Sequence, residues 1–146
     1  MISDDDGKFL VVVAFLIERD DRVLLLRRSV AKDHAPGEWE VGSGRVRQRE
    51  SALEAVVREA REETGLEVQV VRPLDTFHFY RGKSQVETIG VTFHCRATRG
   101  ELTLSPEHIE AKWVRIEDLS TLDCADWQRS CFAAFLAYRL APWFTN

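Results

Sequence analysis

Hydrophobic residues recur along most of the chain with the period of a strand, and in two segments with the period of a helix. The run of β-branched and aromatic residues at 8–18 has almost no polar break, which predicts a strand covered on both faces. Asp20 and Asp21 form the next turn, and residues 22–28 return as the second strand of a hairpin. The further strands that we expect are 39–41, 67–72, 75–80, 85–98, 102–104 and 111–115.

Two segments carry helical signals. Ser51 and Glu54 form the pattern of a capping box, in which each side chain accepts a hydrogen bond from the other residue's backbone, so a helix should begin just after Ser51. Gly65 should end this helix after Thr64, because glycine adopts the left-handed conformation without a Cβ clash. Apolar residues at helical spacing predict a second helix over 126–140. Strands on both sides of one helix, followed by a second helix, indicate an α/β fold with a mixed sheet between helices.

Three glutamates of the first helix point to one side of it. Glu59, Glu62 and Glu63 fall within an arc of about 100°, beside the apolar stripe that would pack on the core. Carboxylates at this density repel one another and cost helix stability, whereas a divalent cation such as Mg²⁺ or Mn²⁺ would use them as oxygen ligands. A solvated acidic surface is the alternative, and it is the commoner one for a glutamate-rich helix.

The spacing of residues around these glutamates favours the metal site. The stretch 44–66 reads GRVRQRESALEAVVREAREETGL, and its key positions are Gly44, Glu50, Arg58, Glu59, Glu62, Glu63 and Gly65. This stretch resembles the signature of the Nudix hydrolases, which cleave nucleoside diphosphates linked to another moiety. The resemblance implies a Nudix α/β/α sandwich in which 44–66 forms a loop–helix–loop. It also implies a single Nudix domain over 1–146, with its core over 8–140.

The same resemblance assigns chemistry to the glutamates. The family hydrolyses a P–O–P linkage with bound Mg²⁺ or Mn²⁺, and the metal serves as Lewis acid, template and activator of water. Glu59, Glu62 and Glu63 match the family's metal ligands, and Glu62 or Glu63 would also be the general base. Arg58 would orient a neighbouring glutamate through an ion pair, and Glu50 would be a supporting carboxylate.

Residues outside the helix complete the expected metal site. Gly42 and Gly44 let the backbone turn sharply and approach another group closely. In the family, the Gly44 region brings backbone carbonyls near the metal. Glu107 stands where similar members place a further acidic ligand, and an exposed loop residue is the equal alternative.

Arginines and aromatic residues are the candidates for substrate binding. Arg45, Arg47 and Arg49 would form a positive rim that attracts phosphates, the alternative being solvated arginines. Arg47 and Arg49 also stand where glutamate and glycine are common in the family. Phe77 and Phe79 share one face of a predicted strand and could stack a base, although such pairs more often belong to a core.

Composition bounds the remaining functions. A chain of 146 residues, 45% hydrophobic and 30% charged, suits one soluble globular domain. The formal charge of −4 gives no reason to expect stable binding of nucleic acid or membrane, and the apolar run at 9–17 is too short to span a bilayer. The acidic start and the three cysteines without metal-site spacing favour a cytoplasmic protein with reduced thiols. We expect a small nucleotide as the substrate, and a homodimer is left open.

Three functions compete for this sequence. The first is a Mg²⁺-dependent hydrolase of a nucleoside triphosphate or a nucleoside diphosphate derivative. The second is a catalytically silent Nudix-like domain that binds a nucleotide as a sensor, and the presence of Glu50, Glu59, Glu62 and Glu63 argues against it. The third is an isoprenoid diphosphate isomerase on the same fold, which predicts a cysteine in the pocket. Cys95 lies in a predicted strand whose surroundings give this third function no support.

Overall fold

The chain folds into a sheet flanked by helices. The computed structural model describes residues 7–32 and 35–140, so the outermost parts of the predicted domain over 1–146 lie outside the described residues. The strands are β1 (Leu10–Arg19), β2 (Arg22–Arg28), β3 (Trp39–Glu40), β4 (Gly42–Arg45), β5 (Glu67–Arg81), β6 (Val86–Arg99) and β7 (His108–Arg115). The helices are α1 (Ala52–Thr64), the 3₁₀ helix η1 (Ile116–Thr121) and α2 (Asp126–Leu140).

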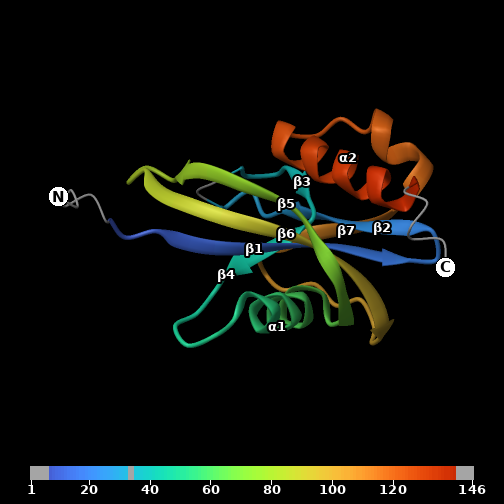
Figure 1. Ribbon diagram of the computed structural model, residues 1–146, viewed down its shortest axis with the longest axis horizontal. Helices are drawn as coiled ribbons and strands as arrows, with labels where there is room; N and C mark the ends of the chain where they lie inside the picture. Colours follow the sequence, from blue (N-terminus) through green and yellow to red (C-terminus); the bar gives the residue numbers. More distant parts are fainter. Residues whose placement is uncertain (1–6, 33–34, 141–146) are drawn as a thin grey trace.

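The strands form one mixed sheet between two helical layers. Its order is β3-β2-β1-β6-β5, with β4 paired to the first half of β1 and β7 paired to β2. β1 and β6 run parallel, and the other pairs are antiparallel. Figure 1 shows α1 on one face of the sheet and α2 on the other. The predicted α/β/α sandwich is confirmed.

Alternate residues of β1 supply the two halves of the core. Val13 and Phe15 face α1 and belong to one buried cluster, while Ala14 and Leu16 face α2 and belong to the other. All four are at most 1% exposed. This alternation follows from the two-residue period of a strand. The predicted strand covered on both faces is therefore confirmed.

The helix α1 begins and ends where the sequence predicts. The backbone N–H of Glu54 donates to Oγ of Ser51 at 3.1 Å, and the N–H of Ser51 donates to Oε2 of Glu54 at 3.2 Å. Gly65 has a φ of 74°, and its N–H donates to the carbonyl of Arg61. These local caps fix both ends of the helix that carries the acidic residues.

One predicted break in the sheet is wrong. The predicted strands 67–72 and 75–80 are a single strand, β5, which lies at an end of the sheet order and pairs with β6. Its register shifts between Val70 and Arg72 and again between Pro73 and Asp75. These irregularities accommodate a proline, which has no N–H to donate to the ladder and is tolerated on an edge strand.

The predicted strand at 102–104 is also wrong. The N–H of Thr103 donates to the carbonyl of Thr64 at 2.8 Å, and the N–H of Ser105 donates to that of Glu63 at 3.3 Å. The segment thus satisfies carbonyls at the end of α1 and pairs with no strand in the described part of the chain. β7 then begins at His108, earlier than the predicted 111, so Glu107 directly precedes a strand.

Candidate active site

The strand β4 lies against the acidic side of α1 because two of its residues have no side chain. Gly42 and Gly44 are both extended without positive φ, so the prediction of a sharp turn there is wrong and the predicted close approach is observed. A Cβ at Gly44 would lie 2.0 Å from Cδ of Glu59, and one at Gly42 would lie 3.0 Å from Oε2 of Glu63. Two helical carboxylates therefore reach the backbone of β4.

Arg58 holds the carboxylates around it. Its guanidinium donates to both oxygens of Glu50, at 2.6 and 2.8 Å, and to Oε1 of Glu59 at 2.7 Å. It also donates to Oε2 of Glu62 at 3.1 Å and to the carbonyl of Arg45 at 2.9 Å. Hydrogen bonds from this guanidinium are the main cause that lowers the pKa of Glu50 to about 2. The structure thus brings together the predicted orienting arginine and the predicted supporting carboxylate.

Glu63 is the most buried carboxylate of the group, at 3% exposed, and its Oε2 has no hydrogen-bond partner among the described residues. Burial, followed by the neighbouring Glu107 and Glu59, raises the pKa of Glu63 to about 10. Burial also acts to raise the pKa of Glu107, but contact with Glu63 and with Lys32, whose Nζ lies 3.3 Å from Oε1, leaves it lowered. In the metal-free protein Glu63 therefore keeps its proton and Glu107 carries the charge.

The chemistry of these residues fits a divalent cation. Their side-chain donors are carboxylate oxygens, which Mg²⁺ prefers, and the unpartnered Oε2 of Glu63 is a buried atom that a cation would satisfy. Among the described residues, no three His, Cys, Asp or Glu side chains already converge on one point. Arg58 holds Glu59 and Glu62 instead. A cation bound beside Glu63 would therefore have to draw the carboxylate of Glu59 away from the guanidinium.

The three arginines of the predicted rim are all exposed, and one of them contacts the carboxylates with its side chain. Nη2 of Arg47 lies 3.6 Å from Oε1 of Glu62, and the backbone N–H of Arg47 donates to Oε1 of Glu50 at 3.0 Å. Arg45 contributes its carbonyl to Arg58. Arg49 has a φ of 69°, the left-handed conformation that favours glycine, which is common there in the family.

An aromatic pocket of about 180 Å³ lies on the other side of β4. Ser43, between the two glycines, lines it, because successive residues of a strand face opposite sides. Phe77 and Phe79 of β5 line the same pocket, as their predicted shared face requires, together with Trp127 of α2. The ring centroids of Phe77 and Trp127 are 5.5 Å apart.

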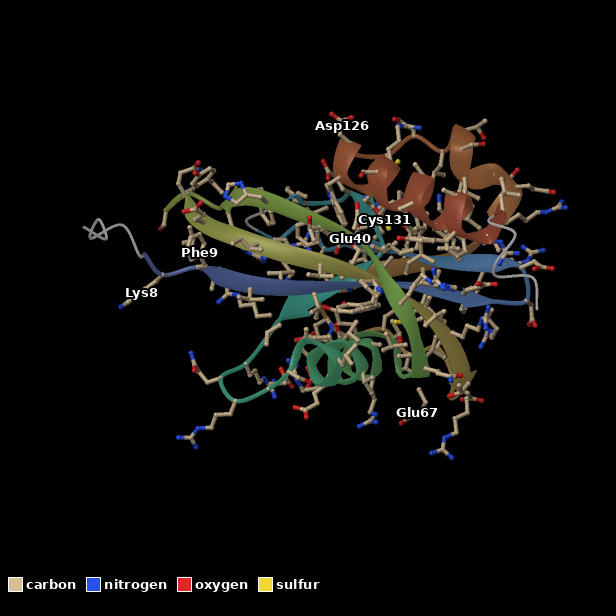
Figure 2. All side chains as sticks on the ribbon, in the orientation of Figure 1. Lys8, Phe9, Glu40, Glu67, Asp126 and Cys131 are labelled. Carbon is tan, nitrogen blue, oxygen red and sulfur yellow. The ribbon has the colours of Figure 1, made fainter. Side chains whose placement is uncertain are left out.

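A buried cluster of Arg28, Glu40 and His108, the first two of which line this pocket, escaped the sequence analysis. Oε1 of Glu40 accepts a hydrogen bond from Nη1 of Arg28 at 2.9 Å and lies 3.1 Å from Nε2 of His108. Glu40 lies beneath α2 in the view of Figure 2. From that helix, Nε2 of Gln128 donates to the carbonyl of Trp39 at 2.6 Å, and Oε1 accepts a hydrogen bond from the N–H of Val41 at 2.9 Å. The cluster joins β2, β3 and β7, which meet only in the fold, so no sequence spacing indicates it.

Comparison with known proteins decides the family. A family model described as the NUDIX domain matches residues 7–135. The chain belongs to the Nudix hydrolase family. This Nudix hydrolase is 34% identical over 139 residues to the CTP pyrophosphohydrolase of Escherichia coli (strain K12), a match that covers 92% of this chain and 96% of that protein. It is 29% identical over 130 residues to nucleoside triphosphatase NudI of Enterobacter sp. (strain 638), covering 83% of this chain and 92% of that one.

Solved structures agree with this assignment. The MutT protein from Methanosarcina mazei Go1 superposes on this Nudix hydrolase with a TM-score of 0.81 and 28% identity, covering 93% of this chain and 99% of that chain. The E. coli ORF135 protein does so with a TM-score of 0.74 and 32% identity, covering 92% and 94%. The predicted MutT-like Nudix fold and the predicted enzyme class, a hydrolase of acid anhydrides in phosphorus-containing compounds, are confirmed.

The structure bears on two further predictions, the cysteine of the isomerase alternative and the absence of a membrane span. Cys95 belongs to the core cluster under α1, and burial raises the pKa of its thiol to about 12. It is absent from the described residues that line the pocket, so the structure gives the isomerase alternative no support. No helix in the described ranges is long and apolar enough to cross a membrane.

Proposed function

We propose that this Nudix hydrolase is a divalent-metal-dependent pyrophosphohydrolase of nucleoside triphosphates. The observation that carries the proposal is the two-sided strand β4. Its glycines receive the carboxylates of Glu59 and Glu63, and Ser43 between them lines the aromatic pocket. In the described sheet β4 pairs with β1 alone, so its other edge has no strand partner, and along this edge we place a phosphate chain that passes from a base in the pocket to the carboxylates.

The carboxylates divide the work according to their exposure. Glu59, Glu63 and Glu107 would hold Mg²⁺ or Mn²⁺ close to the backbone of Gly44. When bound, such a cation offsets phosphate charge and lowers the pKa of water. Glu62 is 48% exposed at its side chain, so we assign it as the general base that takes the proton of the attacking water. The buried Glu63 is assigned as a ligand.

The substrate class rests on the pocket and on the relatives. Phe77 and Trp127 place aromatic rings in the lining of the pocket, and stacking of one base on such a ring contributes about 1–3 kcal/mol. The relatives named CTP pyrophosphohydrolase and nucleoside triphosphatase support a triphosphate over a nucleoside diphosphate derivative. Hydrolysis between the α- and β-phosphates would release a nucleoside monophosphate and pyrophosphate.

The test is turnover of a substrate panel with Mg²⁺ or Mn²⁺. The panel contains triphosphates, oxidised triphosphates, ADP-ribose, nucleotide sugars and dinucleotide polyphosphates. Glu62→Gln and Glu63→Gln are compared with Glu54→Gln, a control on the same helix whose exposed carboxylate only caps the N–H of Ser51, which glutamine can also do.

We expect pyrophosphate release from a triphosphate, with kcat at least about 100-fold lower in Glu62→Gln. Glu63→Gln should weaken metal binding, and Glu54→Gln should change neither quantity. Full turnover in both active-site variants would refute the assignment of these residues. Nucleotide binding without turnover on any substrate would favour the sensor.

A further inference from the structure

We infer that the far end of α2 carries a second binding site, for a small oxyanion of the phosphate class. A groove of about 290 Å³ opens there between β5, β6 and α2. Its walls include Arg72, Arg96 and Arg139, with His94 in the same lining. Small-molecule pockets typically measure about 300–1,000 Å³, so the groove suits orthophosphate or pyrophosphate better than a whole nucleotide.

This groove is separate from the proposed active site. The aromatic pocket is lined by Trp127 at the start of α2, whereas the groove is lined by Arg139 at its end. At 1.5 Å per residue these two positions lie about 18 Å apart along the helix. No residue lines both cavities in the described part of the chain.

The side chains that line the groove bring positive charge to it, since Arg72, Arg96 and Arg139 are among them and no carboxylate is among the described lining residues. Glu18 contacts two of the side chains that line the groove: Oε1 lies 2.8 Å from Nε2 of His94, and Oε2 accepts a hydrogen bond from Nη1 of Arg139 at 2.9 Å. The second acidic neighbour, Asp21, lies 3.6 Å from Arg139 and is 88% exposed. Arg96 is exposed and also interacts electrostatically with Glu18. Arg96 and Arg139 therefore act on one buried carboxylate, and Arg72 adds a third guanidinium to the lining of the groove, in a chain whose net charge is −4.

Aromatic rings hold these cations in place. The guanidinium of Arg72 lies 4.6 Å from the ring centroid of Tyr138, and that of Arg139 lies 5.5 Å from the centroid of Phe135. The ring of His94 packs edge-on against Phe135 with centroids 4.8 Å apart. A guanidinium stacked on a ring can still donate in its own plane, which is the geometry that an oxyanion accepts. The groove is therefore arranged for an anion before one binds.

The experiment is isothermal titration calorimetry of the full chain with orthophosphate and with pyrophosphate, in EDTA so that no divalent metal is bound. A titration with KCl at the same ionic strength is the control. Arg96→Gln and Arg72→Gln remove groove charges. Arg99→Gln removes the same charge from the end of β6 outside the groove, and Glu62→Gln alters the active site. We expect binding that weakens at least about tenfold in both groove variants and is unchanged in both controls.

A second readout locates the anion. Amide chemical-shift changes on titration should concentrate at 94–96 and 135–139. Whichever of the two anions binds more tightly then identifies the ligand within the class. The proposal is overturned if the phosphate anions bind no more strongly than chloride, or if Arg99→Gln weakens binding as much as the groove variants do. It is also overturned if the chemical-shift changes concentrate at 43–50.

Discussion

The substitution Gly44→Ala tests the close packing of β4 on α1. The backbone of Gly44 is compatible with alanine because its φ is not positive, so the obstacle is the side chain of Glu59. The new Cβ would lie 2.0 Å from Cδ, 2.3 Å from Oε2 and 2.5 Å from Cγ of Glu59. Because Cγ is also too close, rotation of the carboxylate alone does not relieve the clash. The whole side chain has to move, and its 2.7 Å hydrogen bond from Arg58 breaks.

The expected loss of stability follows from three contributions. A hydrogen bond between charged groups contributes about 1.5–3 kcal/mol, and a side chain forced off its rotamer costs about 0.5–1.5 kcal/mol. Alanine in place of glycine returns about 0.5–1 kcal/mol of backbone entropy. Glu59 is only 14% exposed at its side chain, so water replaces little of the lost bond. The free energy of unfolding should fall by about 1–4 kcal/mol, and Mn²⁺ affinity by at least about tenfold.

Urea unfolding of the metal-free protein and titration with Mn²⁺ measure these two effects. Ser43→Ala is the neighbouring control, because Ser43 faces away from the carboxylates and should leave Mn²⁺ affinity unchanged. The decisive comparison is Gly44→Ala in a Glu59→Ala background, where the clashing side chain is gone and the added methyl should cost nothing. If the methyl costs as much there as in the wild type, contact with Glu59 is not the cause and the reasoning fails.

Four further predictions test other parts of the site. The pKa of Glu63 is raised from 4.5 to about 10, so the metal-free fold loses stability as pH rises between these values. Glu63→Gln should therefore reduce the fall in the free energy of unfolding between pH 5 and pH 9. An unchanged slope of this free energy against pH contradicts the prediction. A Cβ at Gly90 would lie 2.0 Å from Cζ of Phe77, so Gly90→Ala should push this ring into the pocket. We expect KM to rise about tenfold with kcat nearly unchanged. A change in kcat alone would reject the role of the pocket in substrate binding. Arg49→Gly should raise the free energy of unfolding by up to about 1.5 kcal/mol in calorimetry, since the left-handed backbone of Arg49 costs about 1–2 kcal/mol in residues other than glycine and glycine loses about 0.5–1 kcal/mol in entropy; a lower Tm speaks against it. Arg47→Ala should raise KM severalfold and weaken its dependence on salt, and an unchanged salt dependence rules out the positive rim.

The parts of the structure that the sequence predicts are those set by local rules. The bounds of α1 follow from Ser51, Glu54 and Gly65, whose capping contacts all involve neighbours within four residues. The convergence of the glutamates on one side follows from helical periodicity alone. The α/β/α fold followed from the family resemblance, and periodicity by itself supplied only a mixed sheet between helices.

The parts that were mispredicted or missed depend on contacts between distant segments. Pro73 signals a break, yet β6 pairs with β5 on both sides of it because β5 is an edge strand that can bulge. The segment 102–104 has strand-like composition, but its N–H groups serve the end of α1. The cluster of Arg28, Glu40 and His108 comes from three separate strands, so only the assembled sheet brings it together.

The pairing of β4 with β1 decides which face of this short strand is bare. Gly44 lies opposite Val13, Ser43 opposite Ala14, and Gly42 opposite Phe15. A slip of one residue would turn every β4 side chain to the other face, so a hydroxymethyl group would meet the glutamates and bare backbone would line the aromatic pocket. One extra residue between β3 and β4 would invert this pairing. The enzyme should therefore lose activity from a single insertion at that point, although the insertion removes none of the glutamates.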